Sequence, residues 1–142
     1  VGYVGDDGVT QSTDTDKTEV KDAGGVTVLS VITSYAETYQ FVMLELNKVS
    51  ATVRYGSDAV ETTGDSMTIP HKMPSGESAV FVFELLCTGN KARRIVVPDA
   101  TPNEFGDTQY HIGDAVAYDV TLAANPSGTS REYIAPITGD KK

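Results

Sequence analysis

The side chains that most often carry chemistry are few in this chain of 142 residues: two histidines, His71 and His111, and one cysteine, Cys87. A catalytic triad needs a nucleophile, a base and an acid that orients the base. Neither histidine stands in a nucleophile motif, and the sequence contains no Gly-x-Ser-x-Gly elbow. The pattern therefore favours two solvent-facing loop histidines over a general base or a metal ligand.

The sequence also contains few residues that could bind a metal ion or take part in redox chemistry. The single cysteine excludes an internal disulfide and a cysteine-based zinc site, and its apolar neighbours are typical of a small buried side chain. Asp14, Asp16 and Glu19 resemble the first half of a calcium loop, but the glycine and the distant bidentate glutamate of such a loop are missing. We expect no metal and no cofactor.

The acidic residues are numerous, but their spacing does not indicate a catalytic pair. Twenty Asp and Glu face eleven Lys and Arg, which gives a formal net charge of −9. Two of these carboxylates could converge as a glycosidase pair, but their spacing does not indicate which two. We therefore expect that the protein is not an enzyme, and an enzyme is the third of three hypotheses. A chain this acidic is repelled by free nucleic acid and by anionic membranes, and it has no apolar run near the roughly 20 residues of a membrane helix.

Length and composition predict one mainly β domain. A chain of 142 residues with 39% hydrophobic side chains can bury one real core. Val, Thr and Tyr are plentiful and long helical periodicity is missing, which favours strands. The expected architecture is a β-sandwich or barrel with one short flanking helix.

The N-terminal residues 1–25 differ from the rest. They are polar and acidic, and Gly24-Gly25 closes them as a flexible break. We interpret them as an extended arm with at most one short strand, followed by a β-sandwich domain over residues 26–142.

The next residues predict two neighbouring strands and a helix. Residues 26–34 and 38–46 are β-branched and aromatic runs joined by a link of about three residues, so they are expected to pair antiparallel. In the second run Tyr39, Phe41 and Met43 share one face, and Gln40 lies on the other. Asn47 is a candidate N-cap for a helix over about residues 47–55, and Gly56 its C-cap.

A long irregular segment follows at residues 57–77. Proline and glycine interrupt two short apolar patches, which is typical of a functional loop and compatible with a thin β-hairpin. The strands expected after it are residues 78–87 and 92–97, joined by a Gly-containing turn and ended by Pro98, then 104–110, 115–124 and 131–137.

Several of these strands are two-sided. Glu84 shares a face with Val80 and Val82, while residues 115–124 are apolar on one face and small or acidic on the other. A soluble sandwich can expose such a face to water. Subunits whose sheets join edge to edge into a ring would line a water-filled lumen with it. Arg93 and Arg94 are then expected to pair with acids of a neighbouring subunit.

The sequence resembles the major tail tube proteins of bacteriophages with long, non-contractile tails. The resemblance covers nearly the whole chain, although residues 57–77 match no motif of that family. The segments that carry it are GYVGDDGVTQSTDTDKTEVKDAGG at residues 2–25, VTVLSVITSYAETYQFVMLELN at 26–47, the helix end RYG at 54–56, ARRIVVPDA at 92–100 and YHIGDAVAYDVTLAANPSG at 110–128.

The resemblance implies a structural virion protein located in the tail and assembled in the bacterial host cytoplasm. Its subunits would form hexameric rings that stack into a hollow tube, with a tape-measure protein, a tail tip and a tail terminator protein as partners. Double-stranded DNA would pass without specific binding. The arm and the 57–77 loop would link adjacent rings. The inter-ring residues expected on this basis are Asp14, Asp16, Met67, Ile69, His71 and Met73.

Strand alternation adds a prediction about the lumen. The residues expected to line it are Gln40, Glu84, Asp119 and Thr121, with the opposite strand faces in the core. An acidic lumen would repel phosphates and let the duplex slide. The alternative is a single Ig-like or adhesive binding module on a virion or cell surface. Such a module would be a stable monomer that keeps its function without the arm.

Overall fold

The protein, described by a computed structural model over residues 1–110, 112–113 and 116–137, is mainly β with one α-helix. This confirms the expected class of fold. Its elements are β1 (Val4–Lys21), β2 (Thr27–Met43), α1 (Lys48–Tyr55), the 3-10 turn η1 (Ser57–Ala59), β3 (Glu61–Thr63), β4 (Ser66–Thr68), β5 (Ala79–Cys87), β6 (Lys91–Phe105), β7 (Tyr118–Ala124) and β8 (Arg131–Pro136).

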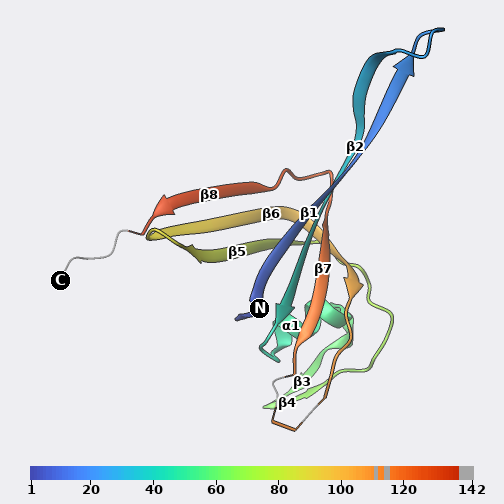
Figure 1. Ribbon diagram of the computed structural model, residues 1–142. Coiled ribbons are helices and arrows are strands. Elements are labelled where there is room, and N and C mark those ends of the chain that lie inside the picture. Colours follow the sequence, from blue (N-terminus) through green and yellow to red (C-terminus); the bar gives the residue numbers. More distant parts are fainter. Residues whose placement is uncertain (111, 114–115, 138–142) are drawn as a thin grey trace.

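One antiparallel sheet organises the chain. Its strand order is β1-β2-β7-β6-β5, and β8 also pairs with β6. The N-terminal half of β6 pairs with β8, and its C-terminal half pairs with β7. β7 and β8 therefore lie one after the other along the same edge of β6. The sheet curls into a half-barrel, and the separate β3–β4 hairpin lies at the lower end of the molecule (Figure 1).

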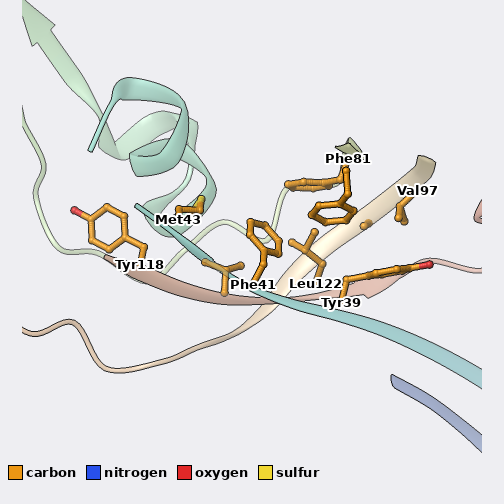
Figure 2. Close-up of a cluster of buried hydrophobic side chains, with 10 residues drawn as sticks. Tyr39, Phe41, Met43, Phe81, Val97, Tyr118 and Leu122 are labelled. Atoms are coloured by element: carbon orange, nitrogen blue, oxygen red, sulfur yellow. The ribbon is translucent and has the colours of Figure 1, made fainter. Parts of the chain in front are cut away.

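The core lies on the inner face of the curl. Tyr39, Phe41 and Met43 of β2 are buried as their alternation predicts. The Phe83 ring of β5 stacks on Tyr39 with centroids 5.7 Å apart and meets Phe41 edge-on at 5.1 Å. Figure 2 shows these side chains converging from different strands beside the helix. The remaining buried members are Phe81, Val97, Ala100, Tyr118, Val120 and Leu122.

The helix forms where its caps predict it. Asn47 Oδ1 accepts from the backbone N–H of Ser50 at 2.9 Å, and the Asn47 N–H donates to Ser50 Oγ at 3.0 Å. The helix ends at Gly56, whose φ of 92° lies in the left-handed region and whose N–H donates to Thr52 O at 2.8 Å. Because the eight residues include weak helix formers, α1 depends on these caps and on packing against the sheet.

The N-terminal segment departs most from expectation. Residues 4–21 are not an irregular arm with at most one short strand; they form the 18-residue strand β1, paired with β2 along its length. The two strands expected at residues 26–34 and 38–46 are the single strand β2. The link at residues 35–37 carries no glycine or proline, so nothing turns the chain there, and the turn lies instead at residues 22–26.

Two further boundaries differ. Pro98 does not end β6, because it sits at a register shift where its missing N–H breaks no ladder bond, and the strand runs on to Phe105. The short strand expected at residues 104–110 is therefore only the end of β6. The β3–β4 hairpin, the β5–β6 turn and the last strand are confirmed; in the strand expected at 115–124, Ala115 lies outside the described residues.

Candidate functional site

The polar face of β2 and β7 is the first candidate surface. Gln40 lies opposite Thr121 in the β2–β7 ladder, and its Nε2 donates to the Asp119 carboxylate at 3.1 and 3.2 Å. All three side chains point away from the core because Tyr39, Phe41, Val120 and Leu122 occupy the inner face. Gln40, Asp119 and Thr121 therefore share one strand face, and their position in a lumen stays a prediction.

The same polar face extends onto strands whose pairing the sequence did not reveal. Thr10 of β1 lies opposite Gln40, and Glu104 of β6 lies opposite Thr121. Ser12 and Thr101 continue the neighbouring row through Thr38 and Ala123. These side chains are hydroxyls, small groups and acids, with no Lys or Arg among them. Finding Thr10 and Ser12 required a full-length β1, and finding Thr101 and Glu104 required a β6 that continues past Pro98.

Glu84 stands apart from this group. It lies on the same side of the sheet, opposite Arg94 of β6. Arg94 and Glu104 are ten residues apart on β6, which corresponds to roughly 30 Å along a strand. Its carboxylate forms an ion pair with Arg94 Nη2. Its neighbours Val80 and Val82 are 65% and 51% exposed, so this end of the face is apolar.

The two predicted interface arginines have partners within the chain. Arg93 Nε lies 2.8 Å from Glu132 Oε1, and Arg94 pairs with Glu84. Both pairs are largely exposed, where an ion pair contributes little to stability. Their predicted pairing with a neighbouring subunit stays a prediction, and it would have to share or replace these bonds.

The predicted inter-ring residues fall into two groups at opposite ends of the molecule (Figure 1). Asp14 and Asp16 lie on the projecting β1–β2 hairpin, where Asp16 Oδ2 accepts from Ser34 Oγ at 2.7 Å. Met67 lies on β4, and Ile69 and Met73 on the segment after it, where the Met73 side chain is 94% exposed. The structure does not bring the two groups together within one chain.

His71 has a packing partner that its loop position did not suggest. Its ring stacks on Tyr55 at the end of α1, with centroids 4.9 Å apart and an interplanar angle of 8°. Tyr55 in turn meets buried Tyr118 edge-on at 6.0 Å, and burial raises the pKa of Tyr118. Arg54 lies over Phe105 at 4.6 Å. This aromatic cluster fixes one point of the segment after β4 to the body. His111 lies outside the described residues.

A buried carboxyl group marks the root of the projecting hairpin. Glu37 is 9% exposed, and its Oε1 accepts from Gln11 Nε2 of β1 and from the Tyr39 hydroxyl. Burial, reinforced by the Glu37 hydrogen bond, raises the pKa of Tyr39 from 10.0 to about 12. The sequence signal for Glu37 was its place in the row that continues through Tyr39 and Phe41, all on the core face.

The opening of the half-barrel is the second candidate surface. A groove of about 1040 Å³ lies between the first nine residues, the outer side of α1 and strand β5. Its lining is predominantly apolar and includes Val9, Val49, Val53, Phe81 and Val82. Val49 is 53% exposed there, although it lies one helical turn before Val53, which packs against the core.

Within residues 1–110, 112–113 and 116–137, no group of three or more His, Cys, Asp or Glu is arranged to hold a metal ion. No helix in that part of the chain is long and apolar enough to cross a membrane.

No protein-family model matches the chain, and no curated protein matches it in sequence.

Proposed function

We propose that this chain is the structural subunit of the hollow tail tube of a long-tailed bacteriophage, assembling into hexameric rings that stack around a lumen for DNA. The observation that carries the proposal is a polar, acid-bearing face on a sheet whose end strands, β1 and β5, each pair on one side alone among the described strands. Gln40, Asp119 and Thr121 form the centre of that face. The resemblance of the sequence to tail tube proteins supports the same assignment.

The sheet edges supply the means of assembly. β1 and β5 lie at the two ends of the strand order, so among the described strands each has a ladder partner on one side alone. An 18-residue edge such as β1 exposes a long row of backbone N–H and C=O groups that other chains can pair with. Joining such edges around a ring would satisfy both and continue the polar face from subunit to subunit.

The charge of that face suits a conduit. DNA is gripped mainly by cationic side chains that displace its counterions. The rows of the polar face carry Asp119 and Glu104 and the hydroxyls between them, and the whole chain has a net charge of −9. Double-stranded DNA would therefore meet repulsion and few attachment points, and it would slide.

The two ends of the molecule fit ring stacking. The β1–β2 hairpin projects from one end, and the segment carrying Met67, Ile69 and Met73 lies at the other (Figure 1). Contacts between these ends would join one ring to the next. The tape-measure protein would occupy the lumen during assembly, with the tail tip and terminator proteins at the tube's ends.

A single adhesive surface module is the second candidate. The apolar groove of about 1040 Å³ favours it, since binding sites for small molecules are mostly apolar hollows of this order of size. In that case the chain would stay monomeric, and the projecting hairpin would be dispensable.

Negative-stain electron microscopy over a concentration series, with and without a tail-tip nucleus, tests the proposal. Six-fold rings or hollow tubes are expected. The matched variant deletes residues 15–21 and 27–35, so that the turn at 22–26 joins Asp14 to Ala36, a pair already in register. It should stay folded and lose assembly. Small particles under every condition, nucleus included, would instead favour the surface module.

A further inference from the structure

The outer part of the β1–β2 hairpin, the arm, has one face on which acids and exposed apolar side chains occur together. Asp14, Asp16 and Val20 alternate along β1, so their side chains lie on the same side of the ribbon. Val20 lies opposite Leu29, and Val31 lies on that side too; their side chains are 48%, 53% and 47% exposed. These five residues form the arm face, which is acidic as well as apolar.

The cations of the arm lie on its other face. Lys17, Glu19 and Lys21 alternate along the opposite side of β1, and Glu19 lies opposite Ser30 of β2. Residues 22–47 contain no Lys or Arg. The arm face therefore carries two carboxylates and no cation. Because a ribbon of two strands is at best marginally stable alone in water, its apolar side chains require a cover.

Another part of the sheet has the opposite charge. The blade, residues 79–97 and 131–136 of β5, β6 and β8, has four cations against two acids, a net charge of +2. Residues 14–35 of the arm have two cations against four acids, a net charge of −2. By contrast, residues 45–58 have two of each, and residues 98–130 have acids but no Lys or Arg. The cations of the blade are Lys91, Arg93, Arg94 and Arg131.

One face of the blade combines cations with exposed apolar side chains. On the side turned away from the core, Arg94 lies between Glu84 of β5 and Tyr133 of β8. Arg131 lies two residues before Tyr133 on the same side. Leu86 and Tyr133 are 85% and 52% exposed, and a hollow of about 720 Å³ lies between them and Arg94. These five residues form the blade face.

The arm face and the blade face do not meet within one chain. The arm and the blade project from the body in different directions (Figure 1). β2 runs without a break from Thr27 to Met43, so the arm continues the sheet and does not bend back toward the blade. A second copy can bring the two faces together. We propose that the arm face of one subunit docks on the blade face of an adjacent subunit.

Charge selects this partner for the arm. Copies with a net charge of −9 repel one another over most of their surface. Docking on the blade instead places Asp14 and Asp16 beside the cationic Arg94 and Arg131, while the apolar side chains of both faces cover one another. Lys17 and Lys21 stay on the far side of the ribbon, so no like charges from the arm approach the arginines.

The contact joins two different surfaces, so it propagates from subunit to subunit and closes into a ring or continues as a filament. The inference rests on the proposed function and deepens it by naming which surfaces of two subunits meet. It also places two sets of predicted contact residues, the acids Asp14 and Asp16 and the arginine Arg94, in one interface. Arg94 would then share its bond with Glu84.

Charge reversal on the two sides of the arm tests the contact. Asp16→Lys changes the arm face, and Glu19→Lys makes the same change on the opposite side. Both side chains are exposed, so both variants should fold, which circular dichroism checks. Each brings the net charge from −9 to −7, so general repulsion between copies would fall equally in both. Association measured by sedimentation should instead weaken roughly tenfold for Asp16→Lys and not for Glu19→Lys.

A second reversal tests the blade. Arg131→Asp should weaken association by a similar factor, and a chain that also carries Asp16→Lys should associate more strongly than either single variant. Equal effects of Asp16→Lys and Glu19→Lys would overturn the proposal. A parent chain that stays monomeric at every concentration, with a tip nucleus present, would overturn it as well.

Crosslinking separates the contact from the tube function. In a Cys87→Ser background, Val31→Cys and Leu86→Cys proteins are mixed and treated with a short bifunctional maleimide, and a covalent dimer is expected. The control replaces Val31→Cys by Ser30→Cys, the neighbouring position on the other side of the ribbon. Equal crosslinking in the control would contradict the docking.

The same crosslink, read beside electron microscopy, gives two further outcomes. Rings or tubes that form without the Val31–Leu86 crosslink would overturn the docking and leave the tube function standing. Crosslinked chains that never form rings or tubes, even with a tip nucleus, would support the docking and count against the tube function.

Discussion

Removing the Glu37 side chain is expected to be among the most destabilising polar substitutions in this protein. Glu37 Oε1 accepts hydrogen bonds from Gln11 Nε2 and from the Tyr39 hydroxyl, and Tyr39 itself is 1% exposed. In Glu37→Ala the buried Tyr39 hydroxyl loses its acceptor, whereas Gln11 is an exposed residue whose side-chain amide can donate to water instead. One unsatisfied buried donor costs about 1–3 kcal/mol, so the expected loss is about 2 kcal/mol.

The expected loss is measurable by thermal and urea unfolding followed by circular dichroism. For a domain of this size about 2 kcal/mol corresponds to a fall in Tm of roughly 7 °C. Glu19→Ala is the matched control, since Glu19 is an exposed acid on the same hairpin, and its effect should stay within about 0.5 kcal/mol. Glu37→Gln keeps an acceptor oxygen and should fall between the two.

A double-mutant cycle separates the hydrogen bond from other losses. Tyr39→Phe removes one donor, so Glu37→Ala should cost less in that background than in the parent, by roughly 1 kcal/mol or more. A Glu37→Ala protein as stable as the Glu19→Ala control would refute the reasoning. So would strict additivity, because it would mean that Glu37 and Tyr39 do not interact in solution.

The remaining predictions concern the core, the helix, pH and the polar face. Phe41→Ala should lower the unfolding free energy by about 3–5 kcal/mol, and Asn47→Ala by about 1 kcal/mol, both measured by urea denaturation. Tyr39 has a folded pKa of about 12 against 10.0 unfolded, so its contribution is full below pH 10 and about 2–3 kcal/mol is lost as the pH rises toward 12. Alkaline unfolding of Tyr39→Phe should lack that component. Assembled tubes of Asp119→Lys should retain DNA at low salt and release it as salt rises, whereas Asp58→Lys, on the exposed η1 turn, should not.

Strand alternation predicted the buried faces well because both sides of each central strand have distinct environments. Tyr39, Phe41 and Met43 are apolar at every second position, and Tyr118, Val120 and Leu122 repeat the pattern on the neighbouring strand. The helix was predicted as well, since Asn47 and Gly56 are specific to helix ends. In these segments local preference and tertiary packing demand the same conformation.

The hairpin was not predicted because its signals are spread over distant residues. The strand β1 contains mostly Thr, Ser, Asp and Lys, and of its side chains only Val4 and Val9 pack against the core, so its sequence is typical of a polar segment. Its conformation comes from the backbone ladder with β2, which begins at Val4 and Met43, 39 positions apart in sequence. The buried Glu37 escaped notice for the same reason, since its partner Gln11 is brought to it by that ladder.

Three features of the single chain are left without a partner among the described residues. The outer part of the β1–β2 hairpin, the arm, exposes Val20, Leu29 and Val31. Among the described strands β1 and β5 each leave one edge unpaired, and the half-barrel leaves an apolar groove open. A stable monomeric module would gain by burying or shortening each of them, because exposed edges and apolar ribbons invite aggregation. Their coexistence on one chain, with an arm too rigid to fold back, is what a subunit designed to be completed by its neighbours would show. The same reasoning makes the arm the first place to look for loss of assembly without loss of folding.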